Sequence, residues 1–377
     1  MDIAMIFLGV GLLLLFAKVL GALTDRFGMS SLVGEICAGI ILGPIAGLIS
    51  MGGFMENFLT FAIVILLFLA GLQVKFDDIR TNSYIASALA LGGGMLSFVF
   101  GTIVGIVFFN SVLAGFAIGV IILSTSDSIL VALLTKTNQL NTHLGKVIIA
   151  GGIADDILGP LVIALFSVYA MHESLSINNI SALFFIAIGL YLVTMTAGDR
   201  IVKQILKIFN KFKDDQILFA IPIALTLLLA FATDRLQLSV AVGAFLSGMI
   251  MANSDFASII DSKVKDLGHG FLIPLFFASI GTLLVFEDIN PIFVVAIAIA
   301  AMGGKFIGAA LVSKLSGFRG NEIKIIGVSL MPRGSENIAL AQLLFALGLI
   351  SVAIYTSVVF AIVLTVIISP ILLRLFK

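Results

Sequence analysis

The chain alternates long apolar stretches with short breaks that carry polar residues, glycine or proline. Most of the apolar stretches approach the twenty or so residues that a helix needs to cross a bilayer. The pattern therefore predicts an all-α polytopic membrane protein with thirteen membrane-spanning helices. The predicted spans are residues 3–22, 31–49, 57–75, 84–109, 112–134, 144–170, 178–197, 216–232, 238–252, 267–286, 291–313, 322–348 and 351–373.

Composition strengthens the membrane assignment. Hydrophobic residues make up 60% and charged residues 11% of the 377 residues, and the mean hydropathy is +1.24. Soluble domains carry about 25% charged residues, so a soluble core is excluded. Basic and acidic residues balance at 21 each, which gives no reason to expect a nucleic-acid partner. One cysteine and three histidines form no metal-type cluster, and we expect no bound cofactor.

The basic residues are distributed unevenly between the loops. Loops that follow odd-numbered spans, together with the C-terminus, hold seventeen of the 21 basic residues, whereas loops after even-numbered spans hold only Arg235. By the positive-inside rule, this asymmetry predicts an external N-terminus and a cytoplasmic C-terminus. The run 3–22 lacks the basic leader and cleavage site of a signal peptide, so we interpret it as a retained span. The seventeen residues are Arg26, Lys75, Arg80, Lys136, Lys146, Arg200, Lys203, Lys207, Lys211, Lys213, Lys263, Lys265, Lys314, Arg319, Lys324, Arg374 and Lys377.

A weak internal repeat is visible at an offset of about 209 residues. The offset covers seven predicted spans, an odd number, so the two copies cross the membrane in opposite directions. Inverted repeats of this kind are the basis of many secondary transporters. The matching positions are Val33-Gly34 with Val242-Gly243, Gly39 with Gly248, Gly71 with Gly281, and Phe76-Asp77-Asp78-Ile79 with Phe286-Glu287-Asp288-Ile289.

Two predicted spans that the same offset relates are interrupted by polar residues at their centres. The span 112–134 contains a run of five polar residues, Ser124 to Ser128. In the span 322–348, Pro332 lacks a backbone donor and Gly334 loosens the helix. We expect both spans to be discontinuous helices, whose freed backbone groups can face an ion halfway across the membrane.

Ionisable side chains are predicted at the same depth. Asp155 and Asp156 stand side by side in the span 144–170, and Lys305 lies in the span 291–313. Such groups are costly in hydrocarbon and mark ion or proton pathways. Desolvation favours a protonated carboxylic acid and a nearby lysine favours the ionised form, so the carboxyl group can change state near neutral pH. Carboxylate, hydroxyl and carbonyl oxygens also suit a small hard cation, and competition between cation and proton for one carboxylate is an exchange mechanism.

Seven segments, taken together and in order, resemble the monovalent cation:proton antiporters. The resemblance is to the branch that contains the electrogenic bacterial sodium/proton antiporters and the Kef-type potassium efflux systems, and it covers essentially the whole chain. The segments are VGEICAGIILGP at 33–44, LLFLAGLQVKF at 66–76, GGIADDILGPL at 151–161, GAFLSGMIMA at 243–252, PLFFASIG at 274–281, GGKFIGA at 303–309 and MPRGSENIAL at 331–340.

The resemblance implies roles for five residues. Asp156 would carry the cation or proton, Asp155 would pair with Lys305 in the unloaded state, and Thr125 and Ser126 would lie beside the ion. It also implies electrogenic exchange of sodium or lithium for protons by a homodimer in the cytoplasmic membrane of a prokaryote, without enzymatic activity.

The resemblance further implies that the two interrupted helices cross in a six-helix core, which moves relative to a dimerisation domain. We expect the core at 57–170 and 267–348. The dimerisation domain is expected at 1–56, 216–266 and 349–377, and a linker helix region at 171–215.

Other functions are consistent with parts of the pattern. Kef-type systems usually show Gln-Asp in place of Asp155-Asp156, and Gln73 replaces a glutamate common in the family. Asp127 resembles the Thr-Asp of electroneutral antiporters, which leaves the charge stoichiometry open. A potassium/proton antiporter or gated potassium efflux system is the main alternative. An intramembrane aspartyl protease is disfavoured because its aspartates sit on separate helices, one in a Gly-x-Gly-Asp motif that is absent here.

Several of these residues also have structural interpretations. Lys305 could neutralise carbonyls at helix ends, and Arg333 and Glu336, one turn apart, could form their own ion pair. Asp127 could cap a half-helix. The hydroxyl groups of the polar run could bond to their own backbone. Glycine clusters at 92–94, 151–152 and 303–304 are expected to permit close helix packing.

Overall fold

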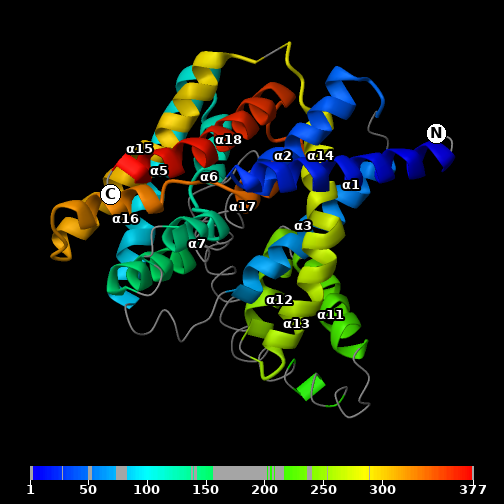
Figure 1. Cartoon of the computed structure of the whole chain (residues 1–377), viewed down its shortest axis with the longest axis horizontal. Helices are drawn as coiled ribbons and strands as arrows, with labels where there is room; N and C mark the ends of the chain where they lie inside the picture. The colour runs from blue at the N-terminus through cyan, green and yellow to red at the C-terminus, as the bar shows by residue number, and fades with distance from the viewer. Residues whose placement is uncertain are drawn as a thin grey trace. The chain divides into compact units, whose positions relative to one another are not determined.

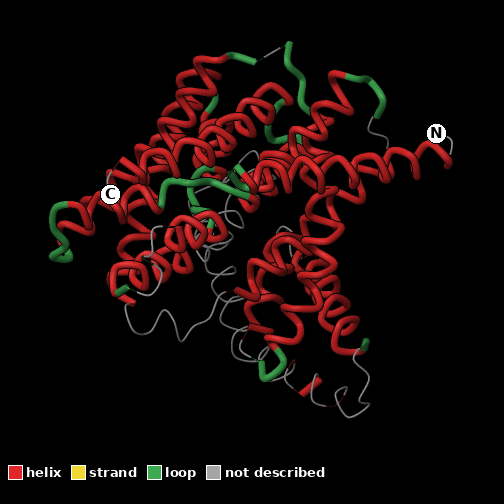
Figure 2. Tube along the Cα trace, in the orientation of Figure 1, coloured by secondary structure: helices red, strands yellow, loops and turns green. Residues whose placement is uncertain are grey.

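The computed structural model describes most of the chain, and every regular element in the described residues is helical (Figure 2). The predicted span 178–197, nearly all of the linker region 171–215 and Asp156 lie outside the described residues. The described residues are 3–27, 29–49, 53–73, 83–136, 139, 142–155, 202, 204, 205, 208, 216–235, 240–252, 254–287 and 289–375.

The chain divides into two compact units (Figure 1). The first comprises Met1–Thr60, Asn82–Asp155 and Phe271–Lys377, and the second comprises Phe61–Thr81 and Asp156–Gly270. Elements of the first unit are α1 (Ile3–Arg26), α2 (Ser31–Ile40), the π-helix η1 (Ile41–Ile45), α5 (Ser83–Phe109), α6 (Val112–Ile121), α7 (Asp127–Lys136), a helical segment at 143–155, α14 (Ile273–Leu283), α15 (Pro291–Leu315), α16 (Asn321–Ser329), α17 (Ser335–Ala346) and α18 (Val352–Leu375). Elements of the second are α3 (Gly53–Gln73) from Phe61 onward, α11 (Ile217–Arg235), α12 (Val240–Ala252) and α13 (Ala257–Leu267), which the π-helix η3 (Gly268–Leu272) joins to α14.

Six helical stretches are long and apolar enough to cross a bilayer. Five of them coincide with predicted spans to within a few residues. Four shorter apolar helices of 10–17 residues fall within other predicted spans. The six are Phe7–Arg26, Tyr84–Phe109, Ile217–Arg235, Ala257–Leu283, Pro291–Leu315 and Val352–Leu373, and the shorter four are Ser31–Ile45, Leu59–Gln73, Val112–Ile121 and Val240–Ala252.

The helical stretch that contains most of the predicted span 267–286 is longer than the span. The helical stretch begins ten residues earlier, at Ala257. The hydropathy pattern did not predict this part of the helix, because its charged residues are typical of a loop between spans. Ile260 and Val264, one turn apart, are nevertheless buried, while Lys265 and Asp261 form an ion pair at 2.7 Å on the same helix. The segment is therefore an amphipathic helix rather than a loop.

Both predicted interruptions are present. The span 112–134 consists of α6 and α7, separated by residues 122–126. The span 322–348 consists of α16 and α17, separated by residues 330–334. We refer to these two segments as the first break and the second break.

In the first unit, α2 and α14 pack with their backbones almost in contact. A Cβ atom added to Gly39 would overlap the carbonyl oxygen of Ala278, and one added to Gly281 would overlap the carbonyl oxygen of Ile36. Only glycine fits at either position, because the atoms in the way are backbone.

The second unit contains the equivalent contact between α3 and α12. A Cβ atom at Gly71 would overlap the carbonyl oxygen of Phe245, and one at Gly248 would overlap that of Phe68. These two glycines are the residues that the offset of about 209 relates to Gly281 and Gly39. The same type of contact therefore occurs once in each unit.

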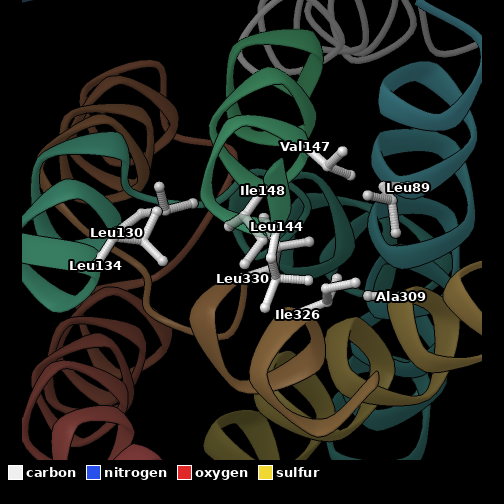
Figure 3. Close-up of a cluster of buried hydrophobic side chains, with 9 residues drawn as sticks. All are labelled: Leu89, Leu130, Leu134, Leu144, Val147, Ile148, Ala309, Ile326 and Leu330. Atoms are coloured by element: carbon white, nitrogen blue, oxygen red, sulfur yellow. The ribbon is translucent and has the colours of Figure 1, made fainter. Parts of the chain in front are cut away.

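A buried apolar cluster in the first unit includes the first residue of the second break (Figure 3). It joins α5, α7, the helix 143–155, α15 and α16, and it includes Leu330 of the second break. Its packing holds the helix 143–155 and α7 against the elements that carry the other polar residues. The cluster consists of Leu89, Leu130, Leu134, Leu144, Val147, Ile148, Ala309, Ile326 and Leu330.

The contact between α2 and α14 yields a stability prediction. Gly39→Ala should destabilise the protein by about 3 kcal/mol, because the added methyl group overlaps a backbone carbonyl that cannot rotate away. Gly11→Ala in α1 is the matched control, since nothing lies within 4 Å of its added Cβ atom. Thermal melting of the purified protein checks the pair, and equal melting temperatures would contradict the packing.

Candidate functional site

A fully buried ion pair lies inside the first unit. Lys305 Nζ of α15 lies 2.5 Å from Oδ2 of Asp155, which ends the described part of the helix 143–155. Both side chains have a relative exposure of 0%. The structure thus brings together the two residues for which an ion pair was predicted. A buried pair must have good geometry and further hydrogen bonds to offset its desolvation.

The first break supplies those further bonds. The backbone N–H of Thr125 donates to Asp155 Oδ2 at 2.7 Å, and Lys305 Nζ donates to the carbonyl of Leu123 at 3.2 Å. Asp155 thus faces the amide end of α7, and Lys305 faces a carbonyl just beyond the end of α6. Each charge has the sign that complements the partial charge of the nearby helix end.

One oxygen atom of the ion pair has no hydrogen-bond partner among the described residues. Asp155 Oδ1 is buried and accepts no hydrogen bond from the described residues. A buried acceptor without a donor is costly, and such atoms are infrequent in folded proteins. This oxygen therefore has capacity for a proton, a cation or a water molecule.

The two breaks meet and satisfy each other's backbone groups. The hydroxyl group of Thr125 donates to the carbonyl of Leu330 at 2.8 Å, and the backbone N–H of Ser126 donates to the carbonyl of Pro332 at 3.0 Å. Thr125 therefore bonds across to the other chain segment rather than to its own helix. The interrupted helices are held together at their non-helical centres.

Local sequence explains why the second break lies where it does. Pro332 disfavours helical geometry in the residue before it, so α16 ends upstream. Gly334 precedes α17, and a Cβ atom on it would overlap the hydroxyl oxygen of Ser126. The close approach of the two breaks thus requires glycine at position 334.

Arg333 uses all five of its N–H groups at this crossing. It is fully buried, and none of its five bonds goes to Glu336. It therefore neutralises carbonyls of both breaks and of α15, where the sequence also allowed an ion pair with Glu336. Its acceptors are the carbonyls of Ile122, Leu330, Met331 and Ala301 at 2.8–3.3 Å and the hydroxyl group of Ser97 at 3.0 Å.

Asn337 is a site residue that sequence reasoning missed. Its Oδ1 accepts from the backbone N–H of Gly334 at 2.8 Å, while its Nδ2 donates to the carbonyls of Ile121 at 2.7 Å and Ser124 at 3.1 Å. It caps α17 and ties it to the first break. An asparagine three residues after a helix-initiating glycine was the available signal.

The other predicted residues lie at the ends of these helices. Asp127 is the first residue of α7, and its side chain lies outside the described residues. Ser126 is buried, and the half-buried Glu336 lies in the first turn of α17, where a negative charge suits the helix end. The described residues hold no group of three or more His, Cys, Asp or Glu side chains suited to a resident metal ion. A transported cation is therefore treated as substrate.

A buried charged pair at the meeting point of two discontinuous helices defines a secondary ion transporter. Residues 11–376 match the family described as "Sodium/hydrogen exchanger, transmembrane". The chain belongs to this family of membrane-spanning cation/proton antiporters, a class of transporters rather than enzymes.

Relatives over nearly the whole chain carry related names. The Na(+)/H(+)-K(+) antiporter GerN of Bacillus cereus is 25% identical, with coverage of 98% of this chain and 95% of the relative. A Na(+)/H(+) antiporter of Enterococcus hirae is also 25% identical and covers 98% of both chains. K(+) efflux antiporter 4 of Arabidopsis thaliana is 24% identical over 92% of this chain and 60% of its own.

A solved structure shares the fold. The sodium proton antiporter MjNhaP1 from Methanocaldococcus jannaschii at pH 8 superposes with a TM-score of 0.73. The match covers 99% of this chain and 96% of that one at 16% sequence identity. The arrangement of helices is therefore that of a known antiporter.

The crossing yields a prediction for Asn337. Asn337→Ala should destabilise the protein by about 2–3 kcal/mol, because three buried backbone groups lose their partner. Gln342→Ala, five residues further along α17, is the matched control, since its buried Oε1 accepts no hydrogen bond from the described residues. Thermal melting checks both, and an Asn337 variant as stable as the control would contradict the role of this amide.

Proposed function

We propose that the protein exchanges Na⁺ or Li⁺ for H⁺ across the membrane by alternating access, and that the exchange is electrogenic. The observation that carries this proposal is the ion pair of Asp155 and Lys305, fully buried where the two breaks meet. Sequestering these charges from water has a high energetic cost, and ion transport gives a reason for it.

Asp156 is the proposed carrier. It follows Asp155, the member of the buried ion pair, directly in the sequence. Its carboxylate binds either a proton or a cation, and hydroxyl and carboxylate oxygens of Thr125, Ser126 and Asp127 complete the set of hard ligands that a small cation prefers. Loading one ion releases the other, and movement of the core then exposes the site to the opposite side.

The charge count supports electrogenic transport. Two neighbouring carboxylates and one lysine can release more than one proton when a single monovalent cation enters. A net charge then crosses the membrane in each cycle. A potential of 100 mV acts on one such charge with about 2.3 kcal/mol, so the potential can drive sodium even when the pH gradient is small.

Potassium/proton antiport or potassium efflux is the second candidate. The printed names of GerN and of the Arabidopsis relative include K(+), which favours this alternative. All three cations accept the same oxygen ligands, so discrimination depends on the size of the site. Initial exchange rates with Na⁺, Li⁺ and K⁺ in the same proteoliposomes distinguish the two candidates.

The proposal extends to the architecture. We infer thirteen spans in two inverted repeats, supported by the equivalent glycine contacts of α2 with α14 and of α3 with α12. The core at 57–170 and 267–348 moves against a dimerisation domain at 1–56, 216–266 and 349–377. The bias of basic residues supports an external N-terminus and a cytoplasmic C-terminus in the cytoplasmic membrane of a prokaryote, and we propose a homodimer.

Asp156→Asn should reduce exchange to background, because an amide cannot alternate between a proton and a cation. Asp266→Asn, at the exposed end of α13, should exchange like the wild type. The assay follows collapse of a pH gradient in proteoliposomes on addition of NaCl, with melting temperatures showing that both variants are folded. An active Asp156 variant would remove this residue from its role.

Lys305→Gln should change the voltage dependence of exchange more than the affinity for Na⁺, because the glutamine retains a hydrogen-bond donor but carries no charge. Lys314→Gln, at the exposed end of the same helix, is the matched control. Initial rates are measured with the membrane potential clamped by potassium and valinomycin. Identical voltage dependence in the two variants and the wild type would count against the pairing as the origin of electrogenicity.

A further inference from the structure

The helices α5 and α15 pack closely enough to press the ion pair against α5. A Cβ atom at Gly308 would overlap the carbonyl of Gly92, and one at Gly304 would come within 2.6 Å of the Cα atom of Ser97. Lys305 lies between these two contacts in the sequence. Much of the Lys305 side chain therefore lies against α5.

Gly93 and Gly94 of α5 face the two members of the ion pair. A Cβ atom at Gly93 would lie 2.9 Å from Cδ and 3.3 Å from Cε of Lys305. A Cβ atom at Gly94 would lie 3.2 Å from Oδ1 of Asp155 and 3.6 Å from the side chain of Leu123. The closest neighbours at both positions are thus side-chain atoms of the site or beside it.

This distinguishes the two glycines from those that only allow packing. At Gly308 the obstructing atoms belong to backbone, so a larger residue there disrupts the helix pair itself. At Gly303 nothing lies within 4 Å of an added Cβ atom, and at Gly151 the nearest atoms, in Leu89, are at an ordinary 3.4 Å. A methyl group at 93 or 94 would move the ion pair instead.

We propose that Gly93 and Gly94 are positioning residues for the exchange site. Gly93 is the surface on which the alkyl chain of Lys305 rests, and it sets the reach of the ammonium group toward Asp155. Gly94 leaves space beside Oδ1 of Asp155, the buried oxygen that accepts no hydrogen bond from the described residues, and so sets the room for the ion or proton that this oxygen takes up. The second role rests on the proposed function, whereas the first does not.

Helix α5 can act on the ion pair only through van der Waals contact, because of its composition. The helix contains no charged residue between Ser83 and Phe109. It therefore contacts the ion pair without adding a charge beside it. Among the described residues, the charges near Asp155 come from α15, as Lys305, and from the second break, as Arg333.

Melting temperatures of a set of double variants test the role of Gly93 without any transport assay. Gly93→Ala should lower the melting temperature by roughly 2–4 °C in the wild type, because the methyl group displaces a restrained side chain. The loss should persist in Lys305→Met, which keeps a heavy atom at the Cδ position. It should vanish in Lys305→Ala, which has none.

Gly303→Ala is the control for the intrinsic gain in helix propensity and should not lower the melting temperature in any background. If Gly93→Ala yields no folded protein, restoration of folding by Lys305→Ala supports the proposal equally. An equal effect of Gly93→Ala in the Lys305→Ala and wild-type backgrounds, or a failure to fold that Lys305→Ala does not restore, overturns it.

The role of Gly94 is tested by transport. Gly94→Ala should raise the apparent KM for Na⁺ by about tenfold, because the methyl group crowds Oδ1 of Asp155. Gly151→Ala, one turn before Asp155 in its helix, should keep the wild-type KM. Equal KM values for the two variants overturn this role. Absence of exchange in the wild type instead refutes the proposed function and leaves the melting test of Gly93 intact.

Discussion

The whole arrangement depends on the carboxylate of Asp155, which is held between the ammonium group of Lys305 and the backbone amide of Thr125. Two interrupted helices leave buried backbone amides and carbonyls without partners in their own helix. These groups have a large energetic cost unless protein atoms pair with them. Asp155 accepts a hydrogen bond from a backbone amide just before α7, and Lys305 donates one to a backbone carbonyl of the first break. The ion pair and the broken helices therefore stabilise one another.

The remaining polar residues at the crossing make it a single connected network. Arg333 bonds to both breaks, to α15 and to Ser97 of α5, while Asn337 ties α17 to α6. Asp155 is linked to this network through Thr125, whose hydroxyl group bonds to Leu330 of the second break, and through Lys305, which bonds to Leu123 of the first break. Buried networks of this kind have few satisfied arrangements, and the proposed alternating access would require a switch between discrete arrangements.

Much of the site could be predicted because its signals are local in sequence. A polar run inside an apolar span and a Pro-Arg-Gly run at 332–334 mark both breaks, and adjacent aspartates draw attention to the helix 143–155. Contacts across about 200 residues carry no such signal. The contacts of Arg333 with Ser97 and Ile122 and those of Asn337 with Ile121 and Ser124 emerged only from the fold. The difference between Gly93 and Gly303, two glycines in similar clusters, also emerged only from the fold. The amphipathic helix α13 was not predicted, because its charged residues lower the mean hydropathy of a segment whose other face is apolar and buried.

The central claim is that the ions exchanged by the protein bind to the carboxylates of the adjacent residues Asp155 and Asp156. Infrared difference spectra of the reconstituted protein, with Asp labelled by ¹³C, measure this directly as Na⁺ is exchanged for an inert organic cation at constant pH. The account predicts a Na⁺-induced change in the labelled carboxyl bands that saturates over the same concentrations as exchange. Labelled bands that stay unchanged at Na⁺ concentrations that saturate exchange would contradict it.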